Sequence, residues 1–138
     1  MTGNKNEIVI SSDLVNLDLI EEFVREIFNF HHLGYDLLSR VMVCLNEAVL
    51  NSISHGNHFE SGKTVVIQSY FCKKFLYFRI IDEGTGFDFN NIPDPTNEEN
   101  LCKEAGRGIF IIRKVSDGIF YRNKGNIVEF RININGDD

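Results

Sequence analysis

The chain has 138 residues, of which 43% are hydrophobic and 25% charged, and its formal net charge is -6. This length allows one domain with a core that needs neither disulfides nor a structural metal, and the composition is that of a globular domain. The acidic balance disfavours nucleic-acid binding, which needs a basic surface stripe. The sequence has no signal segment and no run near the ~18 apolar residues of a membrane span, so we expect a cytoplasmic protein without membrane contact.

The first half of the chain predicts one strand, two helices and a β-hairpin, because apolar residues recur first at helical spacing and then in β-rich runs. Glycines mark the ends of both helices, and only two lysines separate the last two strands. The predicted elements are a strand over residues 7–11, a helix capped by Ser12 or Asp13 and stopped by Gly34, a helix over 36–55 stopped by Gly56, and strands over 63–72 and 75–82.

The second half opens with a segment of different composition. Residues 87–105 are polar, contain both prolines and show little periodicity, which is typical of an active-site lid, although a tolerated surface insertion is an alternative. After Gly106 the pattern predicts a helix, and strands over 119–123 and 126–133 close the chain. Strands and helices do not alternate in this order. The sequence therefore favours an α+β two-layer sandwich, with a mixed, mainly antiparallel sheet and helices on one face.

The three cysteines, Cys44, Cys72 and Cys102, are far apart and odd in number. We expect reduced thiols that pack as small hydrophobic side chains, as suits a reducing compartment.

Two polar residues stand out on the second predicted helix. Glu47 and Asn51 are four residues apart, and therefore share one face of a helix that is otherwise strongly apolar. A solvent-exposed face would explain them. Alternatively the face borders a cleft, in which Asn51 offers a carbonyl oxygen to Mg²⁺ and Glu47 orders or deprotonates a nucleophile.

A carboxylate follows the second strand of the hairpin. Strand alternation puts Asp82 on the same, buried side as Leu76 and Ile80. A buried carboxylate needs a donor, which a ligand such as the N6 amine of adenine can supply. Gly84 and Gly86 would let the backbone approach a flat ring, although an ordinary glycine turn is the alternative.

A third motif, Gly106-Arg107-Gly108, follows the predicted lid. Two glycines that open a helix would present unpaired amides and the positive end of the helix dipole to a phosphate chain, with Arg107 nearby. Taken alone this signal is weak. The known phosphate-loop, protein-kinase and dinucleotide signatures do not occur, so a nucleotide would have to be held in another way.

The three motifs occur in a specific order, with the predicted lid between the last two. Together they resemble the GHKL or Bergerat ATPase fold that DNA gyrase, Hsp90, sensor histidine kinases and MutL share. Within this group the chain most resembles the anti-sigma-factor serine/threonine-protein kinases. The resemblance extends over nearly the whole chain, so residues 1–138 are predicted to form a single histidine-kinase-like ATP-binding domain.

The resemblance implies ATP and Mg²⁺ as ligands. It makes Glu47 the base toward the attacking hydroxyl, Asn51 the Mg²⁺ ligand and Asp82 the partner of adenine N6. The sequence departs from the family near its end, where Gly125-Asn126 replaces a Gly-Thr pair. The residues that the resemblance assigns to cofactor binding are Asn51, Asp82, Gly84, Gly86, Gly106, Arg107 and Gly108.

The resemblance further implies an anti-sigma regulator that phosphorylates a serine on an anti-sigma-factor antagonist protein and sequesters a sigma factor, with homodimerisation as in relatives. One alternative is a non-catalytic ATP-binding interaction module, which the presence of Glu47 disfavours. The catalytic half of a sensor histidine kinase is another, which we disfavour because one domain uses all the residues.

Overall fold

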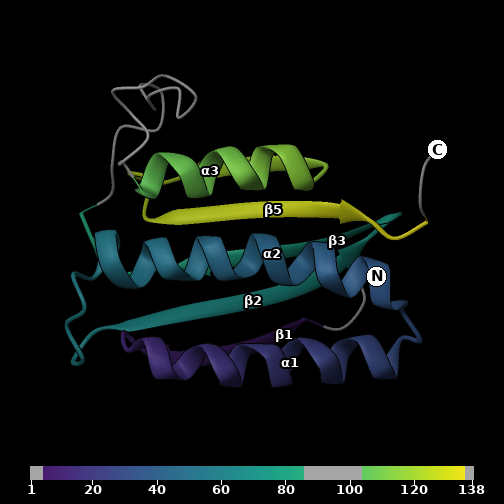
Figure 1. Cartoon of the computed structure of the whole chain (residues 1–138), viewed down its shortest axis with the longest axis horizontal. Coiled ribbons are helices and arrows are strands. Elements are labelled where there is room, and N and C mark those ends of the chain that lie inside the picture. Colours follow the sequence, from purple (N-terminus) through teal and green to yellow (C-terminus); the bar gives the residue numbers. More distant parts are fainter. Residues whose placement is uncertain (1–4, 86–103, 136–138) are drawn as a thin grey trace.

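The computed structural model describes residues 5–85 and 104–135. Its strands form a single sheet in the order β1-β2-β3-β5-β4, and α1, α2 and α3 lie in one layer over one face of that sheet (Figure 1). Every pairing among the described strands is antiparallel, so the predicted α+β two-layer sandwich is confirmed. The elements are β1 (Asn6–Ser11), α1 (Leu17–Phe30), α2 (Tyr35–Asn51), β2 (Thr64–Cys72), β3 (Phe75–Ile81), α3 (Glu104–Val115), β4 (Gly118–Arg122) and β5 (Ile127–Asn133).

The first two helices differ at their ends from the prediction. Asp13 caps a short 3-10 turn ahead of α1, and α1 ends at Phe30, so Gly34 is the N-cap of α2 rather than the stop of α1. The α-helix α2 ends at Asn51, and the chain continues as a π-helical turn, Ser52–Gly56, where we expected an α-helix. A π turn adds a residue to the helical ring and so redirects the side chains that follow it.

The predicted lid lies mostly outside the described residues. The described residues do not include 86–103, so the predicted site residue Gly86 and the thiol of Cys102 lie outside them as well. Glu104 and Ala105 belong to α3 and not to the lid, so α3 begins two residues before Gly106.

The core lies between the helices and the inner face of the sheet. Because side chains alternate along a strand, every second residue of β2, β3 and β5 points toward the helices. Phe78 and Phe130 are fully buried there and their rings stack at a centroid distance of 5.5 Å. Cys44 is also fully buried, as predicted, and burial raises the pKa of its thiol to about 12. Cys72 is a partly buried free thiol.

Glu129 is a buried carboxylate on the sheet face that carries no helix. It is only 1% exposed, and the Tyr70 hydroxyl donates a hydrogen bond of 2.5 Å to its Oε2. The guanidinium groups of Arg79 and Arg122 lie 3.1 and 3.3 Å from its two oxygens. Burial alone would raise the pKa of Glu129, but the Tyr70 hydroxyl and the two arginines outweigh it and hold that pKa below its usual value.

A lowered pKa makes Glu129 a source of stability that acid removes. Its contribution is present above the unfolded-state pKa of about 4.3 and is lost as the pH falls through the lower folded-state value. We expect Glu129→Gln to lower the free energy of unfolding by about 1–3 kcal/mol at pH 7, and we expect this deficit to shrink below about pH 4. Urea unfolding between pH 3 and pH 8 measures both effects.

Glu7→Gln is the control for this series, because Glu7 is exposed and accepts a hydrogen bond from the neighbouring Gln68. It should stay within about 0.5 kcal/mol of the wild type. A Glu129→Gln deficit that does not change with pH would contradict the lowered pKa.

None of the helices in the described part of the chain is both long enough and apolar enough to cross a bilayer.

Candidate functional site

A pocket of about 260 Å³ opens between the helical layer and the end of the sheet. It is lined from α2, the π turn, the residue after β3, α3, β4, and the turn into β5. Apolar walls with a few convergent polar groups are typical of small-molecule sites. The apolar lining residues are Ala48, Ile109, Ile112 and Val128, and the polar ones are Asn51, Ser52, His55, Asp82, Tyr121 and Asn126.

Asp82 is the buried acid of this pocket, at 9% exposure, as strand alternation predicted. Its Oδ1 accepts a hydrogen bond of 2.8 Å from the Gly84 amide. Burial raises the pKa of Asp82 above its usual value, although the Gly84 amide, the Ser52 hydroxyl and the charge of Lys63 act in the opposite direction. A buried carboxylate that faces a cavity is a strong acceptor for a ligand donor.

Two glycines allow the chain to pack tightly around Asp82. A Cβ atom on Gly56 would lie 2.5 Å from the Asp82 Cγ, and one on Gly84 would lie 2.4 Å from the Gly56 carbonyl oxygen. Side chains at these positions would therefore push the π turn away from the segment that follows β3. The sequence pattern predicts Gly56 only as a helix stop, because the π turn that brings it to Asp82 has no local sequence signal.

Glu47 and Asn51 lie on the face of α2 that meets α3. A Cβ atom on Gly108 would lie 2.8 Å from the Asn51 Nδ2 and 3.3 Å from the Glu47 Oε1. Both side chains are half-buried, and Asn51 also lines the pocket. The polar face therefore adjoins the pocket rather than bulk solvent.

The start of α3 differs in detail from the prediction. Because α3 begins at Glu104, Gly106 lies in its first turn, where backbone amides have no intrahelical acceptor. Gly108 lies beyond that turn, so the two glycines do not open the helix together. In the structure Gly108 instead allows α3 to approach the Asn51 side chain closely. Arg107 is exposed.

The turn between β4 and β5 also reaches the pocket. Gly125 has a φ of 93°, which favours glycine, and Asn126 follows it into the pocket lining. The Asn126 side-chain NH2 donates to the Asp82 backbone carbonyl oxygen at 3.3 Å. The Asn126 backbone carbonyl in turn accepts from the Asp82 backbone amide at 3.0 Å. From β4, Tyr121 also lines the pocket, and burial raises the pKa of its hydroxyl. The sequence pattern does not mark Ser52 or Tyr121 as site residues, because neither breaks a periodic pattern.

This fold is that of a known domain class. A sequence profile of the histidine kinase-like ATPase domain matches residues 10–132, and the chain belongs to that family. Among curated proteins it is similar to the "Serine-protein kinase RsbW" of Bacillus cereus (strain AH820), with 24% identity over 92 residues. The same-named proteins of Bacillus anthracis (strain A0248) and Bacillus thuringiensis (strain Al Hakam) match to the same extent. Each match covers 62% of this chain and 57% of the relative, so the chain spans little more than half the length of these proteins.

Proposed function

We propose that this protein binds ATP with Mg²⁺ and transfers the γ-phosphoryl group to a serine of an anti-sigma-factor antagonist protein, and that it sequesters a sigma factor. The observation that carries the proposal is the presence of the buried acceptor Asp82 and of Asn51 in the lining of one pocket, with Glu47 beside Asn51 on the face of α2 that meets α3. Membership of the ATPase domain family and similarity to named serine-protein kinases support it.

The pocket suits the adenine ring of ATP. Its apolar side chains Ala48, Ile109 and Ile112 provide a surface for the faces of a flat ring. Asp82 would accept a hydrogen bond from the N6 amine, and the Asn126 side-chain amide, which has an NH2 group to donate and an oxygen to accept, lies beside it. Asn in place of the family's Thr thus retains hydrogen-bonding groups at this wall.

Asn51 is the protein group that would hold Mg²⁺, through its amide oxygen. Among the described residues there is no cluster of three or more His, Cys, Asp or Glu that could hold a metal. One protein oxygen fits Mg²⁺, which usually keeps several waters and binds substrate phosphates. When bound, the ion would neutralise charge on the β- and γ-phosphates.

Glu47 would accept the proton of the attacking serine hydroxyl. The serine oxygen then bonds to the γ-phosphorus, the bond from that phosphorus to the β,γ-bridging oxygen breaks, and ADP leaves. The Gly106 amide, in the first turn of α3, and the exposed Arg107 would face the phosphate chain. The phosphoserine carries about 1.5 to 2 negative charges and would weaken docking of the antagonist, which frees this protein for the sigma factor.

Replacement of Glu47 separates a kinase from a non-catalytic binding module. We expect Glu47→Ala to reduce phosphotransfer from labelled ATP to a purified antagonist protein about 100-fold or more, because general-base catalysis contributes that much. The Kd for Mg-ADP should change less than about threefold, since ADP lacks the group that is transferred.

Asn46→Ala is the matched control, because Asn46 is the exposed neighbour of Glu47 on α2. It should retain full phosphotransfer. If the wild type binds nucleotide but labels no serine, and Glu47→Ala changes nothing, the kinase proposal fails and the binding module replaces it.

A further inference from the structure

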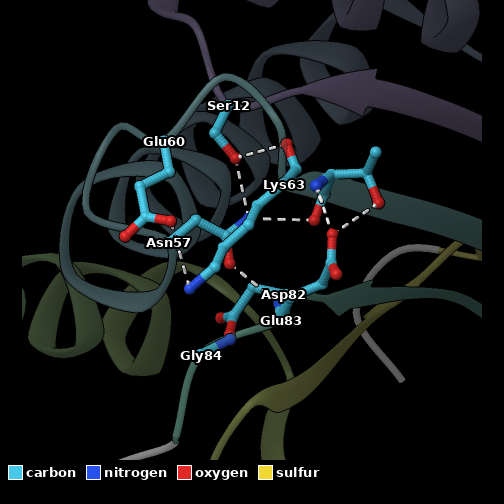
Figure 2. Close-up of polar contacts among 8 residues, drawn as sticks. Ser12, Asn57, Glu60, Lys63, Asp82, Glu83 and Gly84 are labelled. Atoms are coloured by element: carbon cyan, nitrogen blue, oxygen red, sulfur yellow. Dashed lines mark hydrogen bonds and ion pairs between the residues drawn. The ribbon is translucent and has the colours of Figure 1, made fainter.

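A buried side chain outside the pocket joins three distant parts of the chain. Asn57 follows the π turn directly and is 0% exposed. Its Nδ2 donates to the Ser12 Oγ at 2.7 Å and to the Thr64 carbonyl oxygen at 2.9 Å, and its Oδ1 accepts from the Glu83 amide at 2.8 Å. Figure 2 shows Asn57 at the centre of these contacts, between Ser12 and the segment that follows β3.

The amide that Asn57 binds belongs to the residue between Asp82 and Gly84. These neighbours are themselves linked, because the Gly84 amide donates to the Asp82 carboxylate. Glu83 is held a second time, since its Oε2 accepts from the Thr64 amide at 2.6 Å and from the Thr64 hydroxyl at 3.2 Å. The orientation of the peptide that precedes Glu83 is therefore fixed by residues that do not themselves line the pocket.

Asn57 is also tied to the helical wall of the pocket. Its own amide donates to the Ser52 carbonyl oxygen at 2.8 Å, and the preceding Gly56 lies against the Asp82 carboxylate. One residue thus sets the spacing between the π turn and the segment that carries Asp82. A shift of about 1 Å in such a group is enough to weaken a site considerably.

We propose that Asn57 is a positioning residue for the nucleotide site, which orients the Asp82 carboxylate through the Glu83 amide. This inference rests on the proposed function, because it assigns the effect of Asn57 to nucleotide binding. Asn57 touches no ligand itself.

Removal of the Asn57 side chain tests the inference. We expect Asn57→Ala to raise the Kd for Mg-ADP about 10-fold to 100-fold, because the Glu83 amide loses its buried acceptor. Calorimetry should be run at a temperature at which circular dichroism shows each variant folded. In the protein without nucleotide, hydrogen exchange at the Glu83 amide should accelerate and the Gly84 amide resonance should shift.

Ser12→Ala is the matched control, because it removes hydrogen bonds of the same network but leaves the bond from Asn57 to Glu83. It should lower the thermal midpoint while the Kd stays within about twofold and the Glu83 amide stays protected. If Asn57→Ala does not fold, Asn57→Ser replaces it, since Ser keeps a polar group in the buried network but its shorter side chain no longer supplies the Oδ1 acceptor of the Glu83 amide. We expect that variant to raise the Kd about threefold to 10-fold.

Several outcomes would overturn the inference. A folded Asn57→Ala protein with wild-type affinity would do so, as would unchanged protection of the Glu83 amide. If the wild type binds no nucleotide, the proposed function fails, but the exchange and resonance measurements still decide whether Asn57 orients this segment. An unchanged Kd in a folded Asn57→Ser protein would also count against it.

Discussion

Asp82→Asn is expected to abolish nucleotide binding and to stabilise the protein in the absence of nucleotide. Asn presents a donor where the adenine amine needs an acceptor, so we expect the Kd for Mg-ATP and Mg-ADP to rise about 100-fold or more. Burial of the Asp82 carboxylate raises its pKa, which means that the folded state disfavours the charged form. The variant removes this cost, and we expect a gain of about 1 kcal/mol, or about 4 °C in Tm, at pH 7.

The sign of the pH dependence follows from the raised pKa. The stability that Asp82 contributes is fully present below the unfolded-state pKa of about 3.9 and is lost as the pH rises through the folded-state value. The advantage of Asp82→Asn should therefore grow between about pH 4 and pH 7. Thermal unfolding across this range measures it, and calorimetry with Mg-ATP and Mg-ADP measures the loss of affinity.

Nucleotide should reverse which of the two proteins, the wild type or Asp82→Asn, unfolds at the higher temperature. At 100 times its Kd, Mg-ADP stabilises a binding protein by about 2.7 kcal/mol, so the wild type should then unfold at the higher temperature. Asp36→Asn is the control, because Asp36 is exposed in the first turn of α2 and should alter neither affinity nor pH dependence appreciably. Wild-type affinity in Asp82→Asn would refute the assignment of the adenine site.

Gly84→Ala is expected to cause the largest loss of stability. The new Cβ would lie 2.4 Å from the Gly56 carbonyl oxygen and 2.9 Å from the Gly56 Cα, and backbone atoms cannot rotate away as a side chain can. We expect a loss of about 3 kcal/mol, or about 12 °C in Tm. The displaced Gly56 would also move relative to Asp82, so the affinity for Mg-ADP should fall even where the variant is folded.

Gly62→Ala is the matched control for Gly84→Ala. A Cβ atom on Gly62 would meet nothing within 4 Å, and the residue is exposed in a turn. Its Tm should stay within a few degrees of the wild type, since the main effect is on the entropy of the unfolded chain. A Gly84→Ala protein that unfolds at the same temperature as Gly62→Ala would contradict the close contact between Gly56 and Gly84.

Much of the site was predictable because its residues obey local periodicities. The alternation of β3 places Asp82 on the buried side, and the helical spacing of α2 stacks Glu47 above Asn51. Both relations depend only on backbone geometry over a few residues. The order of strands and helices likewise predicts two layers without any knowledge of long-range contacts.

The features that the sequence did not predict depend on residues far apart in the chain. The Asn57 side chain donates a hydrogen bond to Ser12, 45 residues away, and the sequence around Asn57 shows only a polar turn. Strand alternation places Glu129 on the outer face of the sheet, where a charged residue is ordinarily exposed. It is buried because three neighbouring side chains surround it, Tyr70 of β2, Arg79 of β3 and Arg122 of β4. The π turn and the start of α3 are likewise set by packing rather than by propensity.

The position of β5 ties the pocket to contacts between distant parts of the chain. The strand β5 pairs with both β3 and β4. Its residue Val128 lines the pocket together with residues of α2, which lies in the first half of the chain. Neither the first nor the second half of the polypeptide therefore contains a complete pocket. The pocket can therefore form only once β5 has entered the sheet, so its presence reports the long-range assembly of the domain rather than the folding of any one local segment.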